Sequence, residues 1–159
     1  MTSADAVHLD RCVELAEAAL AAGDDPFGSV LVSRDGTVLA EDRNRETTNA
    51  DPTAHPELAL AQWAVRHVPP AERSAATVYT SGEHCPMCAA AHGWAGLGRI
   101  VFAASSAQLV AWRAGWGLPP APVSALPVTD VVPGIEVVGP VAPYDERVHA
   151  LHERRVRPG

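Results

Sequence analysis

Two short motifs near the middle of the chain carry side chains that bind metal ions. Residues 55–57 read H-P-E, and residues 85–88 read C-P-M-C. A neutral imidazole and cysteine thiolates are common ligands of zinc, which prefers four ligands in a tetrahedral arrangement. His55, Cys85 and Cys88 are three such ligands. The sequence therefore predicts a zinc ion with one coordination position left for water, as in a catalytic site.

Glu57 lies two residues after His55, so it is expected to reach that water without binding the metal. Zinc can lower the pKa of a bound water from about 15.7 to about 7. A neighbouring carboxylate can take the proton and return it to a substrate. An H-x-E motif followed by a C-x-x-C motif belongs to the signature of zinc deaminases. The pattern therefore predicts a hydrolytic deaminase with Glu57 as its proton carrier.

The expected positions of these motifs at helix starts also favour catalysis. Pro56 suits the first turn of a helix, because its missing N–H has no partner there. At the start of the second helix, the dipole stabilises thiolates at Cys85 and Cys88. A structural zinc site would need a fourth protein ligand, for which His84 is the only nearby candidate. A zinc-stabilised protein without activity stays open as an alternative.

Three stretches around these motifs resemble the cytidine deaminase superfamily, in its guanine deaminase and tRNA adenosine deaminase branch. Residues 26–32 (P-F-G-S-V-L-V) resemble the first-strand motif of that branch. Residues 51–57 (D-P-T-A-H-P-E) resemble D-P-T-A-H-A-E, and residues 80–88 (T-S-G-E-H-C-P-M-C) resemble T-S-x-E-P-C-P-M-C. The similarity runs from about residue 5 to Ala103. It implies a three-layer αβα sandwich with a five-stranded mixed sheet, and usually a homodimer.

The resemblance also implies a role for each matching residue. It assigns zinc to His55, Cys85 and Cys88, and proton transfer to Glu57. The substrate contacts that it implies are Phe27, Asn44, the backbone N–H of Ala54, and Trp94; His84, which replaces the usual proline beside a ligand, is added as a further pocket residue.

One departure from the family pattern concerns a second acidic residue. Some guanine deaminases are thought to use such a residue after the fourth strand. Here no Asp or Glu occurs between Glu83 and Asp130. The last expected helix, which carries Asp145 and Glu146, is a possible source of such a group. This gap weakens the prediction that guanine is the substrate, but it does not weaken the prediction of deamination.

Strands and helices are expected to alternate along the chain, which indicates a single α/β domain over residues 1–159 with a divergent, proline-rich part from about residue 118. An Asp-Gly pair at residues 35–36 predicts a hairpin, and residues 42–53 are expected to form a loop. The expected strands are 28–33, 37–40, 77–81, 99–103 and 135–138. The expected helices are 4–22, 56 to before Pro69, 86–97, 107–113 and 145–155.

Composition narrows the possible partners. The chain has 159 residues, a net charge of −7 and 12 basic residues. Nucleic-acid affinity is built mainly from basic side chains, so a small-molecule substrate is favoured over RNA. No apolar run is long enough for a membrane span, and the first residues do not form a secretory signal. The three cysteines do not suggest a disulfide scaffold, so a reduced, cytoplasmic setting is expected.

Together these features predict a zinc-dependent hydrolase that removes an exocyclic amino group from a free nucleobase or a related aminated heterocycle and releases ammonia. Guanine is the first expected substrate. Deamination of a nucleoside, or of a cytosine- or pterin-type ring, would use the same groups. An RNA-acting deaminase is disfavoured by the acidic charge and the lack of lysine.

Overall fold

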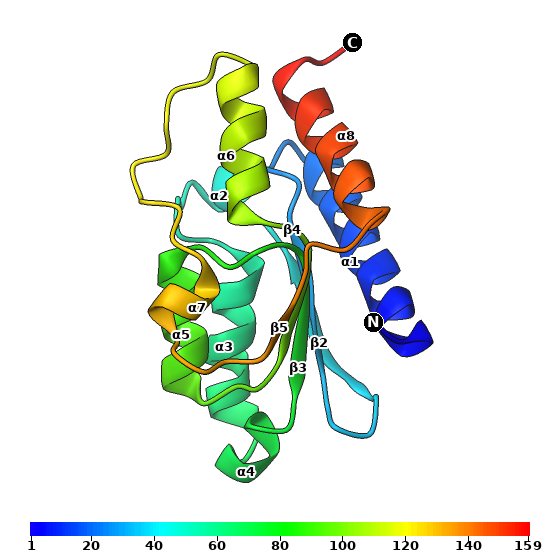
Figure 1. The fold of residues 1–159 in the computed structure, drawn as a ribbon, viewed down its shortest axis with the longest axis vertical. Coiled ribbons are helices and arrows are strands. Elements are labelled where there is room, and N and C mark those ends of the chain that lie inside the picture. The colour runs from blue at the N-terminus through cyan, green and yellow to red at the C-terminus, as the bar shows by residue number, and fades with distance from the viewer.

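A mixed sheet of five strands forms the centre of the molecule (Figure 1). This computed structural model describes residues 1–159. The strand order is β2-β1-β3-β4-β5. β1 is antiparallel to both of its neighbours, whereas β3, β4 and β5 are parallel. The strands are β1 (Gly28–Val32), β2 (Val38–Arg43), β3 (Thr77–Gly82), β4 (Ile100–Ala104) and β5 (Val137–Val138).

Helices cover both faces of this sheet. α1 and α8 lie on one face and α3 and α5 on the other, while α6 lies beyond one end of the strands (Figure 1). The helices are α1 (Ser3–Ala21), α2 (Glu46–Asn49), α3 (Pro56–His67), α4 (Pro70–Arg73), α5 (Pro86–Ala95), α6 (Ser106–Gly115), α7 (Val128–Val131) and α8 (Tyr144–Val156). The predicted α/β fold with a five-stranded mixed sheet is confirmed. None of the helices combines the length and the apolar character that a membrane span requires.

Strand β1 is buried on both faces and connects the two halves of the core. Its side chains alternate, so Val30 joins the cluster under α1 and α8 while Leu31 joins the cluster under α3. Gly28 begins this strand directly below α1. A Cβ on Gly28 would lie 2.4 Å from the Leu15 Cβ and 2.5 Å from the Cys12 carbonyl oxygen. Glycine is therefore required for α1 to pack this closely on the sheet.

One local feature differs from the sequence prediction. Residues 42–53, expected to be a loop, contain the last residues of β2 and the short helix α2. The cap of α1 is Thr2, whose side chain accepts a hydrogen bond from the backbone of Asp5, while the Asp5 carboxylate accepts one from the backbone of Thr2. This reciprocal pair satisfies two backbone donors that the first turn leaves without helical partners.

Asp5 also connects α1 to the sheet. Its carboxylate is 1% exposed and accepts hydrogen bonds from the Tyr79 hydroxyl at 2.8 Å and from Arg99 at 3.0 Å. Burial by itself raises the pKa of Asp5, but the hydrogen bonds from Arg99, Thr2 and Tyr79 outweigh it and hold the pKa well below its usual range. The ionised carboxylate is therefore the form that stabilises the fold.

We expect Asp5→Asn to lower the free energy of unfolding by about 2–3 kcal/mol at pH 7, because it leaves the partly buried Arg99 with only the exposed Glu136 as a counter-charge. Since the pKa of Asp5 is depressed by folding, its contribution is present above about pH 4 and disappears as the pH falls further. Urea unfolding at pH 7 and pH 3 measures both effects. Asp10→Asn is the matched control, because Asp10 pairs with Arg147 in solvent and should change stability by less than about 1 kcal/mol. Equal losses in the two variants would contradict this role for Asp5.

Candidate metal centre and active site

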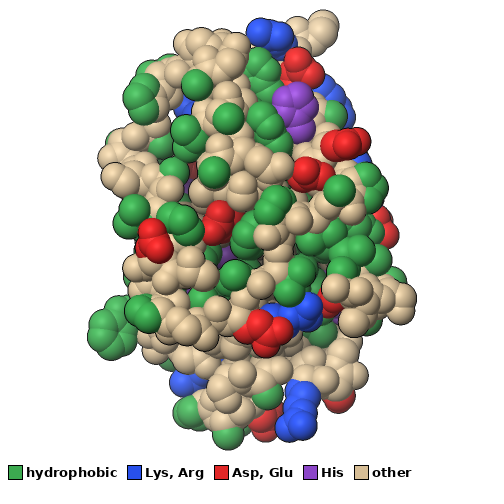
Figure 2. Space-filling model, viewed as in Figure 1, with side chains coloured by type: hydrophobic (Ala, Val, Ile, Leu, Met, Phe, Trp, Pro, Cys, Tyr) green, Lys and Arg blue, Asp and Glu red, His purple; other side chains and the backbone are tan.

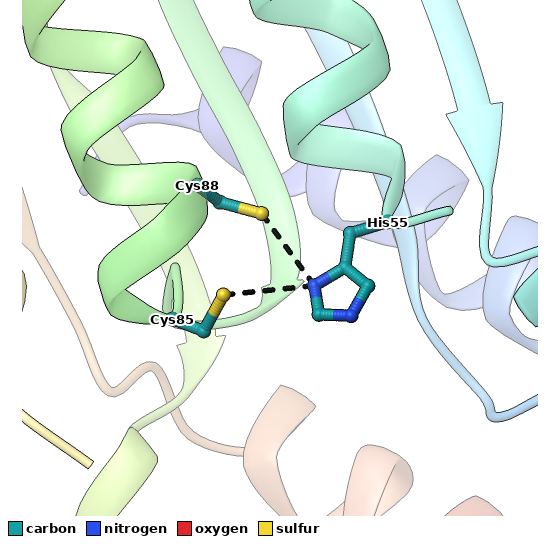
Figure 3. Close-up of side chains that lie close together, drawn as sticks. All are labelled: His55, Cys85 and Cys88. Carbon is teal, nitrogen blue, oxygen red and sulfur yellow. Dashed lines mark hydrogen bonds between the residues drawn. The ribbon is translucent and has the colours of Figure 1, made fainter. Parts of the chain in front are cut away.

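The starts of α3 and α5 bring one imidazole and two thiols together (Figure 3). His55 is the residue before α3, Cys85 is the residue before α5, and Cys88 lies one turn into α5. Each helix begins with a proline at its first position. The three ligand atoms all lie within 4.8 Å of one another, so this group could hold a metal ion.

The distances between these atoms fit tetrahedral zinc. His55 Nδ1 lies 3.6 Å from Cys85 Sγ and 3.5 Å from Cys88 Sγ. With Zn–S bonds of about 2.3 Å and a Zn–N bond of about 2.0–2.1 Å, tetrahedral angles place sulfur and nitrogen about 3.5 Å apart. The donor set and its spacing therefore suit this metal.

The ionisation of the two thiols also favours a bound cation at this group. The hydrogen bond from Cys88, followed by the effect of His55, lowers the pKa of Cys85 to about 4. The thiolate of Cys85 in turn raises the pKa of Cys88 above its ordinary value. Contacts with Cys85 and then Glu46 raise the pKa of His55 to about 10. Two thiolates this close repel each other, and a bound cation would allow both to ionise.

Glu46 lies behind His55, on the side away from the sulfur atoms. Its Oε1 is 3.5 Å from His55 Nε2, and its Oε2 accepts a hydrogen bond of 2.7 Å from Asn44 Nδ2. Imidazoles that bind metals usually donate their other N–H to a carboxylate or carbonyl, which fixes the tautomer and the ring orientation. One carboxylate thus contacts both the candidate metal ligand His55 and the predicted substrate contact Asn44.

Glu57 is buried at the first turn of α3, beside the strands β1 and β3. Its Oε1 accepts hydrogen bonds from Thr80 Oγ1 at 2.8 Å and from Ser29 Oγ at 3.2 Å. Burial raises the pKa of Glu57 above its ordinary value. The two hydroxyls fix the carboxylate in one orientation, and the His-x-Glu spacing keeps it close to His55.

Two of the predicted substrate contacts lie near this group. Asn44 is buried, and its backbone N–H donates to the carbonyl of Phe27. Phe27 is half-buried, with its ring against Gly82 at the end of β3. The structure differs from the prediction for Ala54, because its backbone N–H already donates to the Asp51 carbonyl within a turn.

Two other predicted substrate contacts, Trp94 and His84, do not have their side chains beside the metal-ligand group. Trp94 is 92% exposed on α5. Six residues turn a helix through about 600°, so Trp94 and Cys88 point in widely different directions. His84 is 1% exposed and packs edge-on against His92, with ring centroids 5.2 Å apart. Neither ring nitrogen of His84 has a hydrogen-bond partner. Its position beside Cys85 in the sequence predicted proximity, but the chain turns its side chain inward.

Glu83 holds the starts of two C-terminal helices, α6 and α7, beside the loop that carries Cys85. Its carboxylate accepts hydrogen bonds from the backbone N–H of Ser106, at the start of α6, and of Val128, at the start of α7. Sequence reasoning missed this role, as it missed Glu46 and the buried His152 of α8. For Glu46, the sequence offered one signal, its position two residues after Asn44. For Glu83 it offered none, because its partners Ser106 and Val128 are distant in the sequence.

The last helix brings different groups to this region from those expected. Asp145 accepts a hydrogen bond from the Gln108 side chain, and with Glu146 it lines a hollow on the outer side of Trp112. His152, about two helical turns after Asp145, lies on the inner side of Trp112 near Phe27. The expectation of a second acidic group from α8 therefore gains no support from these positions.

Comparison with known proteins places this geometry in a family. Guanine deaminase from Bacillus subtilis is 40% identical over 97 residues, which span 60% of this chain and 62% of that protein. A crystal structure of guanine deaminase from Bacillus subtilis has a TM-score of 0.59 at 32% identity, covering 80% of this chain and 83% of that one. The chain thus spans less than two thirds of that relative in the sequence match.

Two further similarities cover more of the chain. A probable cytosine deaminase from Schizosaccharomyces pombe is 28% identical over 142 residues, which span 88% of this chain and 86% of that protein. The structure of the protein NE0047 in complex with 2,6-diaminopurine has a TM-score of 0.74 at 26% identity and covers 100% of this chain and 85% of that one. The resemblance to the cytidine deaminase superfamily is confirmed. Because the family model of the MafB19-like deaminases matches residues 4–127 of the 159, the chain belongs to the MafB19-like deaminase family.

Proposed function

We propose that this protein is a zinc-dependent hydrolytic deaminase of a free nucleobase or a related aminated heterocycle, with guanine as the first candidate. The observation that carries the proposal is the convergence of His55, Cys85 and Cys88 beside the buried Glu57, in a chain of a deaminase family. The guanine deaminase relative and the neighbour with bound 2,6-diaminopurine support a purine base as the substrate class.

The reaction replaces the amino group on a ring carbon by an oxygen from water, and ammonia leaves. His55 Nδ1 and the sulfur atoms of Cys85 and Cys88 would hold the zinc ion. Zinc bound there supplies a Lewis acid that lowers the pKa of water from about 15.7 to about 7. Every proton that moves in the reaction then needs a carrier within the protein.

Glu57 is the group that we assign to this proton transfer. Both hydroxyls that orient its carboxylate bind Oε1, so we assign the mobile proton to Oε2. The carboxylate takes a proton from water and delivers it to the ring nitrogen. It then takes a second proton, from the hydroxyl group now on the ring carbon, and delivers it to the departing amine, which leaves as ammonia. Asn44, whose amide Glu46 orients, would hydrogen-bond the heterocycle, and Phe27 would form one wall of its pocket.

Cytosine is the second candidate substrate, because the match to the probable cytosine deaminase spans most of both chains. An RNA substrate has less support. The net charge is −7, and the basic side chains visible in Figure 2 form separate small groups rather than one continuous patch. Ammonia release from a panel of nucleobases, nucleosides, pterins and tRNA, with zinc-loaded protein, tests the proposal. Release from none of them would overturn it.

Metal content provides the first specific test. We expect one zinc ion per chain and its loss in Cys85→Ala and Cys88→Ala, because two remaining ligands cannot hold the ion tightly. Cys12→Ala is the matched control, since Cys12 is a fully buried core cysteine outside the cluster. Elemental analysis of the purified proteins, with circular dichroism to confirm folding, gives the answer. Full zinc in a folded Cys85 or Cys88 variant would contradict the assignment.

Glu57→Gln separates proton transfer from metal binding. The amide keeps the shape of the side chain but cannot carry the proton, so we expect kcat to fall by about 10²–10⁴-fold while zinc content stays at one per chain. Glu41→Gln is a suitable control, because Glu41 pairs with Arg11 on the surface. Near-normal turnover of Glu57→Gln on a substrate that the panel identifies would refute the proposed mechanism.

Glu46→Ala tests the group behind His55. Removing the carboxylate leaves Nε2 without its charged partner, and we expect zinc affinity to fall by about 10–100-fold. Competition with a chromogenic chelator measures this affinity without any need for turnover. Glu14→Ala is the control, because Glu14 is an exposed partner of Arg11. Equal affinities in the two variants would show that Glu46 does not act on His55.

A further inference from the structure

A small cavity lies between α6 and α8, at the end of the sheet where β3 and β4 finish. Its volume is about 20 Å³, and its walls include Phe27, Trp112 and His152. About 10–15 Å³ of such volume is enough for one water molecule. The cavity can therefore take one water-sized group, and its walls combine two aromatic rings with an imidazole.

His152 is the larger of two polar side chains of this cavity that have unused hydrogen-bonding capacity; the other is the Ser106 hydroxyl. It is 7% exposed, and no hydrogen bond from another residue acts on its ring. Burial, with smaller effects from Arg113 and His149, lowers the pKa of His152 to about 4. The imidazole is therefore neutral at pH 7 and offers one donor and one acceptor. The ring nitrogens have no partner within the protein and are not fully enclosed, so a ligand or a water can satisfy them.

Two other polar side chains of the wall, Glu83 and Ser105, are already engaged in hydrogen bonds. Both oxygens of the Glu83 carboxylate accept backbone N–H groups of α6 and α7. The hydroxyl of Ser105 accepts the backbone N–H of Gln108 as the cap of α6. These bonds fix the walls of the cavity in place, and they leave His152 and the Ser106 hydroxyl as the groups that are free to bind a ligand.

The cavity is adjacent to the candidate active site. Glu83, in its wall, is two residues from Cys85, so their Cα atoms are at most about 7 Å apart. Phe27 is two residues from Ser29, which binds Glu57, and its ring lies 4.9 Å from the ring of His152. The cavity and the candidate active site thus share two short stretches of the chain, residues 27–29 and 83–85.

We propose that this cavity is a recognition subsite for a second exocyclic group of the substrate, a carbonyl oxygen or an amino group on a ring carbon other than the one that reacts, and that His152 is its hydrogen-bonding partner. The inference rests on the proposed function and deepens it. A cavity of about 20 Å³ accepts a substituent of one heavy atom and is too small for a ribose or a phosphate. The subsite therefore selects bases that carry two exocyclic groups.

The test compares guanine with 2-aminopurine, which keeps the amino group on the reacting carbon but lacks the carbonyl. We expect the wild-type protein to prefer guanine in kcat/KM. His152→Leu should reduce that preference by about three- to tenfold, chiefly through KM for guanine, because one neutral hydrogen bond is lost. His152→Gln, which can still donate and accept, should restore part of it. If cytosine is the substrate found, the pair becomes cytosine and 4-aminopyrimidine.

The control is His149→Gln, on the same helix, because His149 lies outside the cavity wall. It should keep the wild-type preference. Zinc content and circular dichroism establish that each variant is folded and loaded, and His152→Gln keeps the test available if His152→Leu does not fold.

The outcomes separate the inference from the proposed function. A wild-type protein that deaminates neither base of either pair overturns the subsite, and one that releases ammonia from no member of the panel overturns the proposed function as well. An active wild-type protein whose preference is unchanged in both His152 variants overturns the subsite alone. Equal losses on both members of the pair would show that His152 only supports packing.

Discussion

The packing of α3 against α5 on one face of the sheet is the constraint on which the site depends. His55 and Cys85 are 30 residues apart in the sequence, with the helices α3 and α4 and the strand β3 between them. Small residues such as Ala61, Ala64 and Ala95 occupy the shared cluster and let the two helices approach closely. Because both helices start at the same end of the sheet, His55 meets Cys85 and Cys88 at their N-termini.

This arrangement makes the surrounding residues interdependent. The thiols crowd one another and the imidazole, so their protonation is coupled, and Glu46 reaches the imidazole from the opposite side. Hydroxyls from two adjacent strands hold Glu57 beside them. The same carboxylate of Glu46 orients Asn44, so a single side chain links the candidate metal group to the face where a heterocycle would bind.

The divergent part of the chain contributes the outer walls. Glu83 connects the loop that carries Cys85 to the starts of α6 and α7, and α8 lays His152 against Phe27. These contacts place C-terminal residues within the environment of the core motifs, although that region carries little sequence resemblance. Differences between substrates can therefore arise in the C-terminal part while the metal ligands stay the same.

The order of elements could be predicted from the sequence, because local signals determined it. Asp-Gly marked the hairpin, the prolines at 56 and 86 marked two helix starts, and apolar runs marked the strands. The short motifs also identified the group of His55, Cys85 and Cys88, because residue types that bind zinc and the spacing between them can be recognised in the sequence.

Side-chain direction and distant partners were decided only by the tertiary structure. Trp94 turns to solvent and His84 turns inward, although both lie close to the ligands in sequence. The turn at residues 51–54 occupies the N–H of Ala54, and Glu46 and His152 acquire their positions from α2 and α8. The physical reason is that residue type and spacing specify local chemistry, whereas packing decides which way each side chain faces and what it meets.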